Sequence, residues 1–157
     1  MAMQGRKALL AKLKRIEGAP RKAMRAALAR SADEIVTMQK HLAPKDSGAL
    51  AASIGATFGD WKPANANVRG FGAARAGDPD LTVTIHAGDA TAFYAAFVEF
   101  GTAPHAVGGM FEGAQHPGAR PRPYFYPAWR ANRKRAKAAV ARAAGKAIRD
   151  AAKGSGG

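Results

Sequence analysis

Residues 20–43, PRKAMRAALARSADEIVTMQKHLA, decide the fold class because they carry the strongest helical pattern in the sequence. One stripe of residues recurs at alternating spacings of four and three, which is the repeat of one face of an α-helix. Its members are Met24, Leu28, Ser31, Ile35, Met38 and Leu42. Pro44 follows, and the residue before a proline avoids the helical region. The pattern therefore predicts one long amphipathic helix that ends before Pro44.

The stretch before this helix also favours a helix. Residues 4–17 place Leu9, Leu10, Leu13 and Ile16 on one side, but Gly18 and Pro20 separate them from the stronger pattern. Because proline is at home in a first helical turn, we expect a second helix to start there. A chain of 157 residues fits one domain, here with a helical extension over 1–19 and a core over 20–152.

The residues after Pro44 predict a turn and then a short ordered element. Asp46, Ser47 and Gly48 have turn chemistry, since Asp and Ser side chains bond neighbouring amides and glycine allows an unusual φ. Leu50 and Ile54 then start either one helical turn or a strand.

Residues 80–88, DLTVTIHAG, are the clearest predicted strand in the sequence. Apolar and polar residues alternate from Leu81 to His86, so one face of the strand should be buried. Residues 67–73, NVRGFGA, are a second possible strand within a loop-rich stretch.

Residues 93–105, FYAAFVEFGTAPH, predict a short helix with one carboxylate in its last turn. Asp89 stands where an N-cap is expected, Gly101 where a helix ends, and the phenylalanines 93, 97 and 100 share one face. The helix dipole disfavours an anion near a C-terminus by a few tenths to about 1 kcal/mol. Glu99 therefore needs a cationic or hydrogen-bonding partner.

The chain continues into a long connection and a last helix. Residues 101–123 are dense in Gly and Pro and lack periodicity, and loops of this length are usually functional or disordered. A helix is predicted over roughly 128–152, entered through Pro127, with residues 153–157 as a flexible tail. Its apolar stripe is Trp129, Ala136, Val140 and Ala144.

Together these elements predict an α+β fold. It has a long N-terminal helix, a small mostly antiparallel sheet, a short central helix, a long loop and a C-terminal helix.

The composition limits the possible chemistry. The chain has no cysteine, which excludes disulfides and thiolate chemistry, and its four histidines show no metal-ligand spacing. We find no phosphate-binding loop, nucleophile elbow or dinucleotide fingerprint, so we expect neither an enzyme nor a cofactor. No apolar run approaches the roughly 20 residues of a membrane helix, and the start is unlike a secretory signal, so we expect no membrane partner.

The net charge of +14 favours contact with a polyanion or an acidic protein surface. The predicted last helix carries the basic residues Arg130, Arg133, Lys134, Arg135, Lys137 and Arg142. These could contact phosphates or form a solvated face. The aromatic residues 124–126 follow Arg120 and Arg122 and could stack on bases, although core packing is the favoured interpretation.

Three stretches in this order resemble one family, the tail-completion or head–tail joining proteins of long-tailed bacteriophages, which are also catalogued as minor tail components. The stretches are APKDSGALAASI, FYAAFVEFGT and RPRPYFYPAW, and the resemblance covers about residues 20–150. The matching residues are Pro44, Asp46, Ser47, Gly48, Leu50, Ser53 and Ile54, then Tyr94, Ala95, Val98, Glu99, Phe100, Gly101 and Thr102, then Pro123, Phe125, Pro127 and Ala128. Ala51 stands where the family usually has a basic residue, and the connection after Thr102 is longer than is common.

The resemblance implies a non-enzymatic virion protein, made in the bacterial host cytoplasm. Such proteins form a homo-oligomeric ring, commonly of six or twelve copies, between the portal–adaptor or stopper proteins and the tail tube protein, around the channel through which DNA passes. Glu99 would then be a structural or intersubunit anion, bonded to an arginine or to amides near Gly101. A tail terminator or head stopper ring, and a free basic DNA-binding protein, remain alternatives.

Within this resemblance, the 101–123 connection is the candidate for contact with the tail tube or the channel. Its residues singled out for this role are His105, Met110, Phe111, His116, Arg120 and Arg122. The basic last helix would face DNA or an acidic connector surface.

Overall fold

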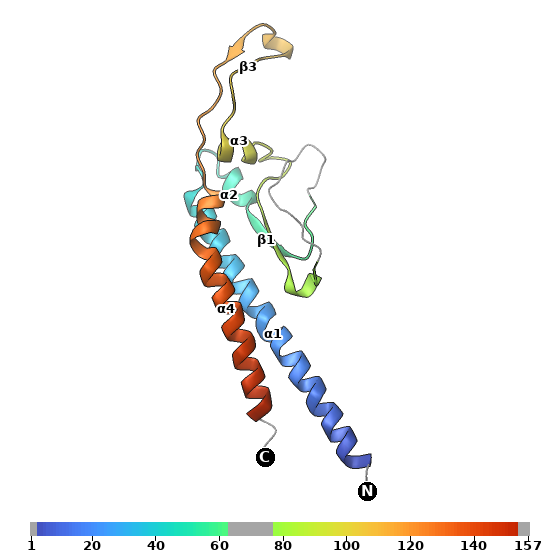
Figure 1. Cartoon of the computed structure of the whole chain (residues 1–157). Helices are drawn as coiled ribbons and strands as arrows, with labels where there is room; N and C mark the ends of the chain where they lie inside the picture. The colour runs from blue at the N-terminus through green and yellow to red at the C-terminus, as the bar shows by residue number, and fades with distance from the viewer. Residues whose placement is uncertain (1–2, 63–76, 154–157) are drawn as a thin grey trace.

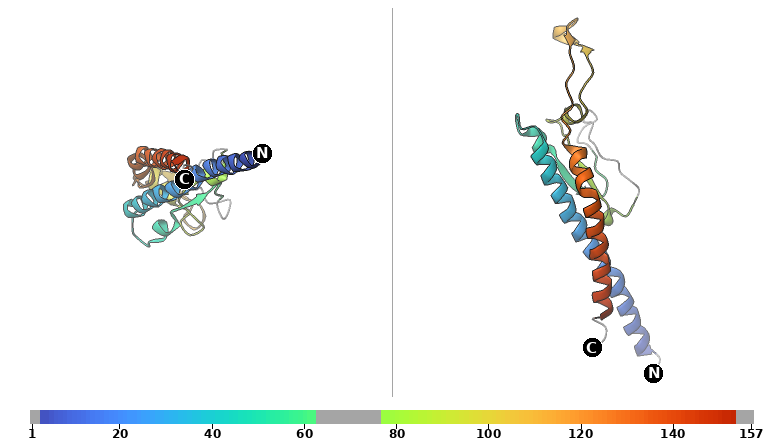
Figure 2. Two further views of the ribbon diagram at one scale, coloured as in Figure 1. Left: turned by 90° about the horizontal axis from the view of Figure 1, so that it is seen from below. Right: turned by 60° about the vertical axis from the view of Figure 1, so that its left-hand side comes forward.

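The computed structural model describes residues 3–62 and 77–153, with side chains left undescribed at several positions before Gly18. Two long helices, α1 (Met3–Leu42) and α4 (Phe125–Lys153), lie side by side along the molecule (Figures 1 and 2). Small helices and strands pack against one end of this pair, and residues 102–119 project beyond it, away from the chain termini (Figure 1). We call residues 102–119 the arm. The fold is α+β, as the sequence predicts.

Helix α1 is continuous, so the predicted break at Gly18 and Pro20 is wrong. Pro20 lies inside the helix. A proline inside a helix costs about 3 kcal/mol, because its N–H is missing and its ring crowds the preceding turn. The residues on both sides are mostly Ala, Leu, Lys and Arg, which are strong helix formers and carry the helix through. Of the predicted stripe before Gly18, the side chains of Leu9, Leu13 and Ile16 lie outside the described residues.

The buried side of α1 agrees with the predicted stripe over its middle only. Ile35 and Ser31 are buried, whereas Met38 and Leu42 are exposed. Ala27, Ala32 and Gln39 take their place on the buried side. The contact face therefore turns around the helix toward its C-terminal end, because α4 and the small elements approach α1 from different directions.

The short elements after α1 form a helical turn followed by a two-stranded sheet. Helix α2 (Ala49–Ser53) leads directly into β1 (Gly55–Phe58), so both alternatives for this stretch are realised in succession. Strand β1 pairs antiparallel with β2 (Val83–His86), and a short 3₁₀ helix, η1 (Pro79–Leu81), precedes β2. The possible strand at 67–73 lies outside the described residues.

Strand β2 is covered on both faces, where the sequence predicted one buried face. Val83 and Ile85 are partly buried on the side of α1 and α4. Thr84 on the other face is buried and donates to the Gly59 carbonyl at 2.7 Å. His86 stacks on Trp61 with ring centroids 4.5 Å apart. The second face is thus closed by the residues that follow β1.

The packing of His86 makes the stability depend on pH. Burial lowers the pKa of His86 below its ordinary value of 6.5, and its Nδ1 has no hydrogen-bond partner among the described residues. The unfolded chain therefore binds a proton more readily than the folded chain, and stability is lost as pH falls below about 6.5. We expect the urea midpoint to fall between pH 7 and pH 5.5, and His86→Phe to remove part of that fall. His41→Phe, at an exposed position, is the control and should show the same fall as the natural chain. A fall of that same size in the His86→Phe variant would contradict the prediction.

The main core lies where α1, α2 and the start of α4 meet. It contains Leu50, Ile54, Tyr124 and Phe125, surrounded by small residues. The small residues are Ala43, Ala87, Ala92 and Ala95. Leu50 and Ile54 come from the predicted turn motif, so this motif brings α2 and β1 into the core.

The central helix is shorter than its sequence suggests. Helix α3 (Ala95–Phe100) has six residues, and the Asp89 carboxylate instead accepts from the amides of Thr91 and Ala92 in the turn before it. Gly101 ends α3, as expected, with a φ of 72°. Phe93 and Phe97 are about half exposed, at 55% and 49%, so their face is not part of the core.

The connection over 101–123 is ordered as a hairpin, which corrects the prediction of a stretch without regular structure. Strand β3 (His105–Ala106) pairs antiparallel with β4 (Gln115–His116), and a 3₁₀ turn, η2 (Gly109–Phe111), forms the tip. Within residues 3–62 and 77–153, the predicted small sheet is thus two separate two-stranded pairs. Helix α4 begins three residues before the predicted start and runs to Lys153; residues 154–157 of the predicted tail lie outside the described residues.

Candidate functional site

Glu99 is the buried centre of the junction between α3, the arm and α4. Its side chain is only 3% exposed. Its Oε2 accepts from the backbone amides of Tyr124 at 2.7 Å and Phe125 at 2.9 Å, and its Oε1 accepts from the amide of Tyr126 at 3.1 Å. A single carboxylate from one helix therefore caps the N-terminus of another.

The start of α4 explains why one carboxylate is enough. The first four amides of a helix have no partner within it. At α4 these belong to residues 124–127, and the fourth is Pro127, which has no N–H. Glu99 accepts from the other three. The positive end of the α4 dipole also favours an anion at this position, which outweighs the unfavourable end of the short α3.

The predicted need of Glu99 for a partner is confirmed, but the partner differs from the expectation. The hydrogen bonds come from amides of residues 124–126 and not from amides near Gly101. No arginine forms a salt bridge with Glu99 among the described residues. These three bonds lie within one subunit, and they fix where the arm returns to α4.

Tyr124 completes this junction from the side of the core. It is fully buried, and its hydroxyl donates to the Ala95 carbonyl at 3.4 Å. Burial, and then the negative charge of Glu99, raise the pKa of Tyr124. The phenol therefore stays protonated and neutral. Together with the buried Phe125, it confirms that these two aromatic residues serve in packing; Tyr126 is partly exposed.

Two glycines form the base of the arm. Gly101 and Gly118 have positive φ values of 72° and 83°, in the region that favours glycine. A Cβ on Gly101 would lie 2.5 Å from the Ala119 carbonyl oxygen, and a Cβ on Gly118 would overlap the Thr102 carbonyl oxygen. Thr102 and Ala119 exchange two backbone hydrogen bonds of 3.0 and 3.1 Å. Each glycine thus leaves room for the strand opposite.

The arm continues from this base as a narrow ribbon with an apolar tip. His105 and His116 face each other across β3 and β4 with stacked rings, centroids 5.0 Å apart. Met110 and Phe111 at the tip are 94% and 68% exposed. Arg120 and Arg122, after the arm, are exposed as well, and the Arg122 amide donates to the Val98 carbonyl.

The first family motif holds α2 in place. Gly48 precedes α2 with a φ of 78°, and the Ser47 hydroxyl accepts weakly from the Ala49 amide at 3.4 Å. The buried Ser53 hydroxyl donates to the Leu50 carbonyl and accepts from the Gly88 amide. Asp46 is exposed. Apart from Asp46, these residues build the turn and the core around it.

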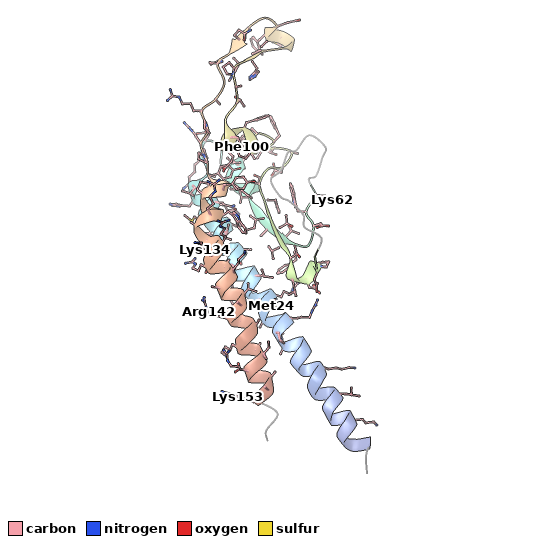
Figure 3. The ribbon with its side chains drawn as sticks, viewed as in Figure 1. Met24, Lys62, Phe100, Lys134, Arg142 and Lys153 are labelled. Atoms are coloured by element: carbon pink, nitrogen blue, oxygen red, sulfur yellow. The ribbon has the colours of Figure 1, made fainter. Side chains whose placement is uncertain are left out.

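The remaining motif residues surround Glu99. Tyr94 is half-buried against the core, and Pro123 is exposed immediately before the capped amides. Phe100 is 60% exposed where α3 gives way to the arm, as labelled in Figure 3. The three motifs are far apart in sequence, and the fold brings the second and third into direct contact through Glu99.

The basic residues of α4 are exposed along the helix. Arg130, Arg133, Lys134, Lys137 and Arg142 form no salt bridge within the part of the chain that the structure describes. Arg135 differs, since it pairs with Glu34 of α1 at 2.7 Å. Figure 3 labels Lys134 and Arg142 on the α4 ribbon.

Asp78 and Asp80 join η1 to α1. Arg21 pairs with Asp78 at 2.6 Å, and Arg25 pairs with Asp80 at 2.7 Å. The backbone amide of Asp80, and then Arg21, lower the pKa of Asp78. These exposed pairs orient η1 on the helix.

Two important positions carry weak sequence signals. Gln39 lies on the polar-looking part of α1, yet it is fully buried and its amide donates to the Phe125 carbonyl at 3.2 Å. Gly118 is one glycine among several in its stretch.

Among the described residues, no group of three or more His, Cys, Asp or Glu is arranged to hold a metal ion. No helix in the described ranges has the length and apolar character needed to cross a bilayer.

Comparison with known proteins adds the family. A model described as "Bacteriophage HK97-gp10, putative tail-component" matches residues 7–101, which is more than half of the chain. The match runs from α1 through Glu99 and ends at Gly101, where the arm begins. No curated protein and no solved structure gives a significant match. The chain therefore belongs to the HK97-gp10-like family of bacteriophage tail components.

Proposed function

We propose that this protein is a non-enzymatic structural component of the virion that forms a ring of identical copies at the head–tail interface. The ring, of six or twelve copies, joins the portal–adaptor complex to the tail tube around the DNA channel. Membership of a tail-component family supports this role, since it places the chain among the virion proteins of a tailed phage.

The observation that carries the proposal is the amount of apolar surface that a single copy leaves exposed. Phe93, Phe97, Met110 and Phe111 are all about half or more exposed. The main core of the subunit is small and rich in alanine. The exposed side chains form two separate groups, one at α3 and one at the tip of the arm, and groups of exposed apolar side chains are typical of interfaces. Contacts between copies that close into a ring would cover this surface and add the stability that the small core lacks.

The charge of the chain fits a position near DNA or an acidic connector. Five cationic residues on α4 have no carboxylate partner among the described residues, as given above. In a ring, they would face the DNA in the channel or the acidic surface of a neighbouring protein. A tail terminator or head stopper ring at a neighbouring position would use the same features.

Deleting the gene from the phage tests this role. We expect heads that package DNA but carry no tails, together with free tails, in electron micrographs, because the joining ring is missing. Resupplying the protein from a plasmid should restore joined particles. A terminator would instead yield tails of abnormal length, and a stopper would yield heads that lose their DNA. Intact, infectious particles without the protein would contradict the proposal, and would be the result expected of a free DNA-binding protein.

A further inference from the structure

An apolar groove runs between α1, β2 and α4 and has no occupant among the described residues. Its volume is about 430 Å³. The predicted stripe of α1 and the predicted stripe of α4 face each other across it. The apolar lining comes mainly from Met24, Leu28 and Ile35 of α1, Val83 and Ile85 of β2, and Trp129 and Val140 of α4. We call it the interhelical groove.

The tip of the arm is the apolar feature that complements this groove. Met110 and Phe111 are 94% and 68% exposed at the turn of a narrow hairpin. Figure 1 shows that the arm extends away from the α1–α4 pair, beyond the end at which α4 begins. The groove lies along the pair itself. A subunit in this conformation therefore presents its tip to another molecule and not to its own groove.

The charges of the groove and the arm favour binding of the tip to the groove of a second copy of this chain. Arg133 and Lys137 line the groove beside its apolar residues. The arm contains Glu112, next to Phe111, and no Lys or Arg, although the chain as a whole carries +14. The arm shares the lack of Lys and Arg with the residues before it, 77–101, and it is the part of this stretch that projects from the subunit. It can therefore approach α4 of another copy without repulsion. The same carboxylate makes the tip a poor contact for DNA.

We propose that the arm tip of one copy inserts Met110 and Phe111 into the interhelical groove of the next copy, where Glu112 pairs with Arg133 and Lys137. This contact joins different surfaces of two identical subunits, so it repeats around a ring until the ring closes. The inference rests on the proposed ring and names the contact that builds it.

Cysteine pairs test the contact directly, because the natural chain has no cysteine. Gly108→Cys lies beside the tip, where an added Cβ meets nothing within 4 Å, and Ala141→Cys lies at the groove. The two single variants are mixed as purified full-length proteins and oxidised. We expect a 108–141 disulfide between chains, identified by mass spectrometry of the linked peptides.

Ala138→Cys is the matched control, because Ala138 is exposed on the same helix but does not line the groove. We expect the yield of the 108–141 disulfide to be roughly ten times that of the 108–138 disulfide, as for a contact favoured by about 1.4 kcal/mol. Equal yields of the two disulfides, or no disulfide in either mixture, would overturn the proposal.

Charge reversal gives an independent readout. Glu112→Arg alone, or Arg133→Glu with Lys137→Glu, should each weaken self-association roughly tenfold in sedimentation velocity. Mixing the two variants should restore association, because each arm then meets a groove of opposite charge. Lys134→Glu with Arg142→Glu changes the net charge equally but lies outside the groove lining, so this control should self-associate as the natural chain does. An equal loss of association in the control, or no restoration when the Glu112 and Arg133/Lys137 variants are mixed, would overturn the specific contact.

These results separate the contact from the function. If deletion blocks tail joining but the 108–141 disulfide does not form, the proposed head–tail role stands and the proposed arm contact is wrong. If the disulfide forms but tails join without the protein, the chain self-associates and the head–tail role is wrong.

Discussion

Replacing Glu99 with alanine is expected to lower the free energy of unfolding by on the order of 3–5 kcal/mol, which is a large part of the stability of a domain of this size. Three amides at residues 124–126 would lose their acceptor, and two of them are at buried positions. An unsatisfied buried donor costs about 1–3 kcal/mol, and water can reach only the more exposed end of this group. Urea denaturation of the purified chain gives the measurement.

Two further variants separate the cap from a general effect of losing a carboxylate. Glu99→Gln keeps the shape but brings an NH₂ group against one of the three amides, so its loss of stability should be intermediate. Glu34→Ala removes an exposed carboxylate that pairs with Arg135, and such pairs are worth about 1 kcal/mol or less. A Glu99→Ala protein as stable as the Glu34→Ala protein would show that the cap does not hold α4.

The parts of this fold that could be predicted are those set by neighbouring residues. The middle of α1 follows from the spacing of Met24, Leu28, Ser31 and Ile35, because a helix repeats at that interval. The strand β2 follows from alternation, and the end of α3 follows from Gly101. The dipole argument also establishes that Glu99 needs a partner, although it does not say which.

The parts that could not be predicted depend on residues distant in sequence. The partners of Glu99 lie about 25 residues away, and they are backbone amides, which leave no side-chain pattern to detect. Gln39 reaches Phe125 across 86 positions. Helix α1 continues through Pro20 because the helix propensity of the residues along its whole length outweighs the local cost of the proline.

The arm shows the same limit in another form. Its strands β3 and β4 have two residues each, which is too short for alternation to be visible. Its register is set by the bridge between Thr102 and Ala119 and by the glycines beside them. The composition shows only that this stretch is rich in Gly and Pro. Which of its glycines are required becomes clear only from the structure, where the two strands of the arm lie opposite each other.

Replacing Gly118 with alanine is therefore expected to open the base of the arm. The methyl group would overlap the carbonyl oxygen of Thr102 and crowd Ala103, both on the strand opposite, so the hydrogen bonds between Thr102 and Ala119 cannot remain as they are. The positive φ adds about 1–2 kcal/mol of strain. We expect hydrogen exchange of the Thr102 and Ala119 amides to accelerate roughly a hundredfold, which corresponds to about 2.8 kcal/mol.

Gly113 provides the matched control, because it also has a positive φ, of 91°, but an added Cβ there meets nothing within 4 Å. Gly113→Ala carries the backbone strain without the clash, so the amides of Thr102 and Ala119 should keep most of their protection. The Glu99 cap lies outside the arm, so the urea midpoint of Gly118→Ala should fall much less than that of Glu99→Ala. If the two glycine variants exchange equally fast, backbone strain alone sets the cost, and the close approach of the strands does not hold the arm in place.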